Sequence, residues 1–250
     1  MTENSASSRD NSRGSHRFVL GLAVGGLVGL FVARRLAAPR RMPFLGLWQR
    51  ALAGKRGDAE AARLAALAQA RYDELYAGRS RLPNRALRIH LERSILPGLA
   101  LYQTLLEEGD DRQTALAEME HVMASTVSRL RGLMSFLGRL PKPFAIFRRI
   151  EPWVIRLGFP TEGWEMEPVQ ESEECVAFNV RRCFYLDTLR SFGAPELTPV
   201  YCGGDDVVFP ALAPAITWER TMTLGRGHDR CDFRWRRAAP EGAASGEREG

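Results

Sequence analysis

The chain has 250 residues, 45% of them hydrophobic, which is enough to bury one sizeable core. Its net charge of +5 belongs to the N-terminal segment, because residues 1–56 contain ten Lys or Arg and two acidic residues, while the remainder is slightly acidic. This distribution argues against nucleic-acid binding, and four cysteines without a C-x-x-C pair argue against a disulfide framework.

The N-terminal region predicts a membrane anchor. Residues 1–16 are polar and are expected to form a disordered tail. Residues 18–33 then carry no charge and are bracketed by Arg17 and Arg34, so we predict a single transmembrane helix over 17–36. A signal peptide and a buried core helix are the alternatives. More Lys and Arg follow this segment than precede it, which predicts a cytoplasmic body.

Small residues form a stripe in the predicted anchor. Gly21, Gly25 and Gly29 are spaced four residues apart, which would let two such helices approach closely and form a homo-oligomer. The alternative is that glycine is simply common in membrane helices. Residues 37–57 follow as a predicted basic linker, whose Trp48 is expected at the membrane interface.

Residues 58–236 are predicted to form the folded body, and residues 237–250 a disordered tail. Up to Gly158 the apolar residues recur with helical spacing, and after it they alternate with a period of two. Capping residues and prolines give the expected helices, which are 58–78, one from Asn84 kinked at Pro97, one from Asp110 or Asp111, and 144–157 interrupted at Pro152. The expected strands lie near 164–170, 176–180, 215–224 and 230–235, with helices at 183–192 and from Pro195 to Gly203 or Gly204.

The single change of hydrophobic period predicts the fold class. It favours an α+β body in which the N-terminal helices cover one face of a small, mostly antiparallel sheet. A parallel sheet built from βαβ units would need the pattern to return to long helices, and it does not.

Candidate site residues gather in the last third of the chain. Cys202 and Asp205 are three residues apart, so a helix places the thiol and the carboxylate on one face. Arg220 lies on the apolar face of a predicted strand, where it needs a carboxylate or a ligand anion, since an unpaired buried guanidinium costs several kcal/mol. Cys231 is expected to face the same core from the next strand. The sequence therefore predicts one cavity lined by these side chains, with Asp206 as an alternative to Asp205.

Several motifs of this region resemble one family. They are Cys183, C-x-x-D at 202–205, R-T-x-T-L at 220–224, G-x-x-x-C-D-F at 227–233 and, upstream, I-L-P-G-L-A-L-Y-Q-T-L at 95–105. In their order and spacing they resemble the L-2-amino-thiazoline-4-carboxylic acid hydrolase family.

This resemblance implies a small-molecule substrate that carries a carboxylate and an amidine on one ring, which water opens at the amidine carbon. Arg220 would bind the carboxylate through its planar fork, and Asp205 or Asp206 would pair with the protonated amidine. Two mechanisms remain open. In one, Cys202 attacks as a thiolate and Asp205 assists proton transfer; in the other, Asp205 activates a water molecule and the cysteine is structural.

The expected function is a membrane-anchored hydrolase, and the rival is a non-catalytic ligand-binding or scaffold domain of the same fold. The candidate catalytic residues are Cys202, Asp205 and Cys231, and the candidate substrate-binding residues are Arg220, Asp206, Thr223 and His90. No metal or cofactor is expected, because Cys183, Cys202, Cys231 and His90 lack the local spacing of ordinary zinc ligands. The alternative is that the cysteines and His90 have a purely structural role, because free cysteines are commonly buried and His90 lies at the boundary of the apolar face of its helix.

Overall fold

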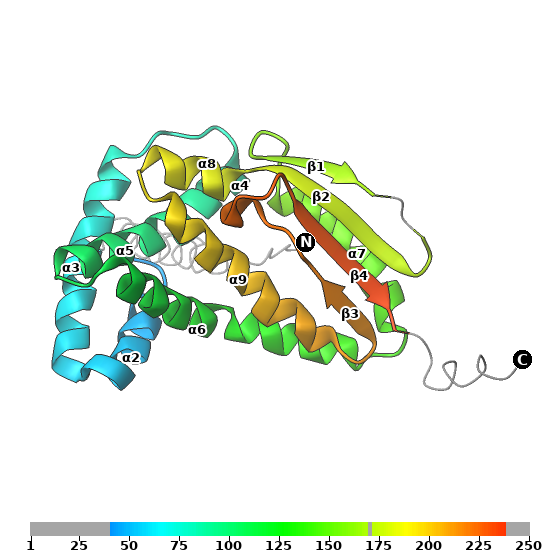
Figure 1. The fold of residues 1–250 in the computed structure, drawn as a ribbon, viewed down its shortest axis with the longest axis horizontal. Helices are drawn as coiled ribbons and strands as arrows, with labels where there is room; N and C mark the ends of the chain where they lie inside the picture. The colour runs from blue at the N-terminus through cyan, green and yellow to red at the C-terminus, as the bar shows by residue number, and fades with distance from the viewer. Residues whose placement is uncertain (1–40, 170–171, 239–250) are drawn as a thin grey trace, which may run out of the picture. The chain divides into compact units, whose positions relative to one another are not determined.

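The computed structural model describes residues 41–169 and 172–238, and the chain from Met42 onward forms one compact unit (Figure 1). The predicted anchor at 17–36, with its glycine stripe, lies outside the described residues. So do the predicted tails, except for residues 237 and 238. None of the described helices combines the length and the apolar character that crossing a bilayer requires.

The first part of the described chain is helical, as predicted. The side chain of Asn84 accepts a hydrogen bond from the backbone N–H of Ala86 at 2.9 Å, and that of Asp111 accepts one from Thr114 at 2.8 Å. These N-caps confirm two of the predicted helix starts. The helices are α2 (Leu45–Arg56), α3 (Asp58–Gly78), α4 (Arg85–His90), α5 (Leu96–Glu107), α6 (Arg112–Gly138) and α7 (Pro143–Gly158). The predicted interruption of the last helix at Pro152 is wrong, because α7 continues through this residue.

The long helix that we predict from Asn84 is divided rather than simply kinked at Pro97. A π-helical turn (Leu91–Ile95) separates α4 from α5, and Pro97 lies in the first turn of α5, where a helix tolerates proline. The next residue, Gly98, lies close to Tyr201: a Cβ atom on Gly98 would lie 2.0 Å from the hydroxyl oxygen of Tyr201. A side chain at this position would therefore push Tyr201 away from α5.

A first hydrophobic core fills the helical half of the molecule. It is formed by α2, α3, α5 and the first half of α6, with residues of the later helices packed against them. The largest fully buried side chains of this core include Trp48, Tyr72, Tyr102, Leu64, Leu99 and Met119.

The segment predicted as a basic linker is helix α2 over most of its described length. Trp48 and Leu52 are only 2% and 1% exposed, and the Trp48 indole donates a hydrogen bond to the hydroxyl of Thr126 at 2.7 Å. The linker prediction and the membrane-interface position of Trp48 are therefore wrong. Residues four apart share a helix face, so both side chains enter the same core.

The C-terminal part forms an antiparallel sheet with the strand order β1-β2-β4-β3 (Figure 1). Val176 lies opposite Trp235, and Val180 opposite Cys231, so these four side chains share the apolar face of the sheet. The predicted α+β class and antiparallel sheet are thus confirmed. The strands are β1 (Trp164–Pro168), β2 (Cys175–Cys183), β3 (Ile216–Glu219) and β4 (Cys231–Arg237).

A second core covers the apolar face of the sheet. Phe144 and Phe147 of α7 pack with Val176 and Trp235, together with the C-terminal end of α6. Among the described residues of this core, none comes from α2, α3 or α5. The prediction that the N-terminal helices together cover the sheet is therefore wrong for these three, because they bury their apolar faces against one another.

Two further helices, α8 (Phe184–Ser191) and α9 (Thr198–Val208), lie between the helical half and the sheet, with the 3₁₀ turns η2 (Pro195–Leu197), η3 (Phe209–Leu212) and η4 (Leu224–Arg226). The helix predicted from Pro195 is expected to end at Gly203 or Gly204. This prediction is wrong, because α9 continues through both glycines while packing along α6. A Cβ atom on Gly204 would lie 3.6 Å from Val127 of α6. Packing here outweighs the cost of a helical glycine, about 1 kcal/mol.

Strand β3 ends at Glu219, earlier than the predicted strand over 215–224. The Asp232 carboxylate accepts hydrogen bonds from the backbone N–H groups of Thr221 and Met222 at 2.9 and 2.6 Å. These side-chain contacts replace regular strand pairing for that segment. Arg220 therefore lies on an irregular stretch next to β4.

Candidate functional site

Arg220 is the centre of a polar cluster between α9 and the end of β3. Its side chain is 2% exposed. One terminal nitrogen donates to Asp205 at 2.8 Å, and the other donates at 2.8 Å both to Asp206 and to the backbone carbonyl of Cys202. A buried guanidinium thus has the carboxylate partners that its position requires.

The two carboxylates lie at the accessible edge of this cluster. The side chains of Asp205 and Asp206 are 38% and 43% exposed. Partial burial raises the pKa of Asp205 to about 6, although the charge of Arg220 favours the ionised carboxylate. A carboxylate with this pKa can accept a proton near neutral pH.

Two thiols flank the backbone of η4. The N–H of Leu224 donates a hydrogen bond to the sulfur of Cys231 at 3.2 Å, and a Cβ atom on Gly225 would lie 3.1 Å from the sulfur of Cys202. Burial raises the pKa of Cys202 to about 12 and that of Cys231 to about 11, and it also raises the pKa of Cys183. These thiols are therefore protonated at neutral pH.

Several buried polar atoms without a hydrogen-bond partner lie on the elements of the cluster. Within residues 41–169 and 172–238 five such side-chain atoms occur, and three of them belong to Thr198 of α9 and to Arg220 and Thr223 of the segment before η4. The Thr198 methyl group lies 3.0 Å from a Cβ position on Gly225, so Thr198 faces η4. Unpartnered buried groups are costly, and a bound ligand or water would satisfy them.

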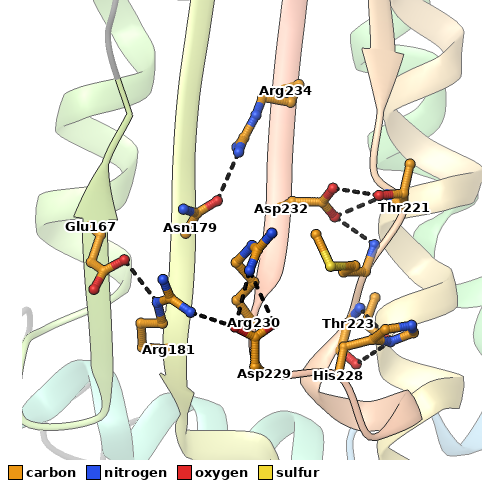
Figure 2. A network of polar contacts seen from close by, with 11 residues as sticks. Glu167, Asn179, Arg181, Thr221, Thr223, His228, Asp229, Arg230, Asp232 and Arg234 are labelled. Carbon is orange, nitrogen blue, oxygen red and sulfur yellow. Dashed lines mark hydrogen bonds and ion pairs between the residues drawn. The ribbon is translucent and has the colours of Figure 1, made fainter.

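Asp232 holds the segment that carries Arg220 and Thr223 in place. Figure 2 shows its carboxylate directed at Thr221 and at the backbone nitrogen of the next residue. Burial raises the pKa of Asp232, but the hydrogen bonds from Thr221 and Met222 more than offset this, so the pKa lies below its usual value. Asp232 therefore remains an ionised anchor for this segment.

His90 does not join the Arg220 cluster directly. Its ring nitrogens lie 2.8 Å from the carbonyl oxygen of Gly158 and 3.0 Å from the hydroxyl of Tyr185, and burial lowers its pKa. Tyr185 in turn interacts electrostatically with Asp205 and Cys183, and burial raises its pKa to about 12. Tyr185 therefore lies between His90 and the cluster.

The structure thus brings together most of the candidate residues, leaving out His90. The residues in the cluster are Cys202, Asp205, Asp206, Arg220 and Cys231, and Thr223 precedes the Leu224 N–H that bonds to Cys231. Sequence reasoning missed Thr198, Tyr185, Gly225 and Asp232. Asp232 had a signal, because it belongs to the C-D-F motif, and Tyr185 follows Cys183 by two positions.

Other kinds of site receive no support from the described residues. No group of three or more His, Cys, Asp or Glu in them is placed to hold a metal ion. A surface hollow of about 620 Å³ lies elsewhere, and no residue of the Arg220 cluster lines it. Its lining residues are Lys142, Pro143, Phe144, Ala145, Pro214, Ala215, Arg237 and Ala238.

Comparison with known proteins identifies the family. The model of the L-2-amino-thiazoline-4-carboxylic acid hydrolase family matches residues 88–235, which is more than half of the chain. The chain belongs to this family. None of the curated proteins and none of the solved structures matches it. The part shared with the L-2-amino-thiazoline-4-carboxylic acid hydrolase family contains the whole Arg220 cluster and begins within α4, after α2 and α3.

Proposed function

We propose that this chain is a hydrolase that opens a small cyclic amidine or amide by adding water at the Arg220 cluster. The observation that carries the proposal is Asp205, a carboxylate with a pKa of about 6 that a buried arginine holds at the accessible edge of the cluster. A general base of this pKa works well near neutral pH. Family membership supports the proposed substrate class, a ring that carries an amidine and a carboxylate.

In the proposed step, Asp205 takes one proton from water while the water oxygen bonds to the carbon of the protonated amidine. The ring bond from that carbon to sulfur or nitrogen then breaks, and the departing atom receives the proton from Asp205. The second water proton leaves the oxygen for bulk solvent as the C=O double bond forms. Asp206 pairs with the protonated amidine, and the buried hydroxyls of Thr198 and Thr223 bind the substrate carboxylate.

The protonation of the thiols favours this route over covalent catalysis. A nucleophilic cysteine needs a thiolate, and a pKa of about 12 leaves Cys202 almost entirely protonated at neutral pH. Both terminal nitrogens of Arg220 already bind the two aspartates. We therefore assign Arg220 the role of positioning Asp205 rather than that of clamping the substrate carboxylate.

Turnover of L-2-amino-thiazoline-4-carboxylate by the purified full chain tests the proposal, and Arg220→Lys tests the positioning role. An ammonium cannot reach both carboxylates and the Cys202 carbonyl, so we expect kcat/KM to fall by about 100-fold, as for a displaced catalytic group. The matched control is Arg226→Lys, an exposed arginine of η4, which should leave kcat/KM unchanged. Substrate binding without turnover in the wild type would favour the non-catalytic alternative.

The proposal includes a membrane anchor over residues 17–36, with a cytoplasmic body and a homo-oligomer formed through Gly21, Gly25 and Gly29. Its support is the uncharged run at 18–33 between arginines. We expect the full chain to stay in the membrane fraction after extraction with carbonate or high salt. Release by either treatment would exclude a spanning anchor.

A further inference from the structure

Helix α7 has an apolar stripe on its outer side. Ile150, Trp153, Val154 and Leu157 are 48%, 62%, 53% and 72% exposed, respectively. Their spacing of three, four and seven residues from Ile150 places them on one face of the helix. We call these four residues the α7 stripe.

The first two turns of α7 are already used by the fold. Phe144 and Phe147 pack against the sheet, as described above. The α7 stripe is therefore additional apolar surface, beyond what the second core needs. Four large apolar side chains in adjacent positions exceed the scattered exposure that is normal for a soluble surface.

Basic residues lie along one edge of the α7 stripe. Arg149 and Arg156 lie on the helix surface beside it, and Arg148 is also exposed. Glu151 is the one acidic residue in the sequence of α7, and the sequence contains no acidic residue at all over 121–150. The α7 stripe is thus bordered by a positively charged edge.

We propose that the α7 stripe docks on an anionic phospholipid bilayer. Helices that lie in a membrane interface combine Trp, Leu and Ile on one side with Lys or Arg on the other. Tryptophan prefers the headgroup region, and arginine is attracted to anionic headgroups while its stem covers apolar surface. In α7, Arg149 and Arg156 lie beside the exposed Trp153 and Leu157, while the first turns of the helix pack on the sheet.

Charge argues against two other occupants. In a symmetric dimer through this face, the arginines of one α7 would meet the arginines of the other copy's α7. The apolar segment at 18–33 is flanked by Arg17, Arg34 and Arg35, so it would also bring like charges to the stripe. An anionic bilayer complements the charge of this face.

Trp153 provides a native probe for the test. Trp48, Trp164 and Trp235 are at most 4% exposed, and Trp218 is partly buried. The full chain is reconstituted in vesicles of phosphatidylcholine, or of an equimolar mixture with phosphatidylglycerol, whose acyl chains carry bromine. Quenching of tryptophan fluorescence then reports contact of Trp153 with the acyl chains, and Trp153→Phe gives the background.

We expect Trp153-dependent quenching in the anionic vesicles and its loss at high salt. The double variant Arg149→Glu/Arg156→Glu should weaken docking by more than about tenfold, because each arginine near an anionic surface contributes several-fold. Its matched control is Arg50→Glu/Arg190→Glu, which makes the same charge change at exposed arginines of α2 and α8 and should keep the quenching. The wild type and all variants contain residues 1–40, so a difference in quenching between them reports on α7 alone.

Other results overturn the proposal. Equal quenching in wild type and Trp153→Phe would show that the stripe does not reach the lipid. Protection of Trp153 from aqueous acrylamide in neutral and anionic vesicles alike would mean that a second copy or residues 18–33 cover it. Hydrolase activity is measured separately without lipid, and it should be unchanged in the Arg149→Glu/Arg156→Glu variant.

Discussion

Asp205→Asn is expected to lower kcat/KM by about 10²- to 10⁴-fold, the usual contribution of a general base. Asparagine keeps the shape and can still accept a hydrogen bond from Arg220, but it cannot take a proton from water. The wild type should also show a pH-dependent limb: because the base works only when ionised, kcat/KM should rise as the pH increases through about 6, the pKa of Asp205. Steady-state rates measured on either side of pH 6 check both expectations.

Cys202→Ser separates the two mechanisms. A serine hydroxyl removes the thiol but keeps the size of the side chain, so the water mechanism predicts turnover close to that of the wild type. The covalent mechanism predicts loss of turnover with Cys202→Ser.

Full activity of Asp205→Asn, or a flat profile around pH 6, would refute the role of Asp205. An exposed carboxylate of α8 supplies the control, and Asp187→Asn should have no effect.

Gly98→Ala is expected to destabilise the fold by about 1–3 kcal/mol, the usual cost of overpacking a core. The new methyl group would lie 2.0 Å from the Tyr201 hydroxyl oxygen and 3.0 Å from the adjoining ring carbon. That hydroxyl donates to the carbonyls of Ser94 and Ile95, at 3.1 and 3.3 Å, so moving it breaks contacts with the π-helical turn. Thermal unfolding should show a melting temperature lower by about 5–10 °C.

Gly132→Ala is the matched control for this prediction. Gly132 lies inside α6, and a Cβ atom there would meet nothing within 4 Å. Alanine in an open helical position should leave stability unchanged or raise it by up to about 1 kcal/mol. If both alanines lowered the melting temperature equally, steric contact with Tyr201 would not be the cause.

Local signals predicted the helices well where capping and apolar spacing agreed. Helix α3 has the predicted bounds because of its apolar stripe, although Gly57 rather than Asp58 is at the N-cap and no side chain caps the helix. The side chain of Asp111 fixes the start of α6. Gly203 and Gly204 misled the prediction because glycine usually ends a helix, whereas here packing against α6 continues it. Such a contact between distant segments has no local signal in the sequence.

The candidate site was predictable in its charges but not in its roles. The position of Arg220 among apolar residues indicated that it needed a carboxylate, and the structure supplies Asp205 and Asp206. The protonation of Cys202 depends on how deeply α9 packs, which spacing alone does not give. Gly225 was missed because its importance arises only from the approach of η4 to the sulfur of Cys202.

Helices α2 and α3 precede the region shared with the family, yet they belong to the same folding unit. Trp48, Leu52, Leu64 and Tyr72 from these helices are at most 2% exposed. A fragment cut where the family similarity begins would expose the surfaces of α5 and α6 that α2 and α3 cover, and such surfaces promote aggregation. Sequence similarity and physical integrity therefore give different domain boundaries, and an expressible body should start near Met42 rather than at residue 88.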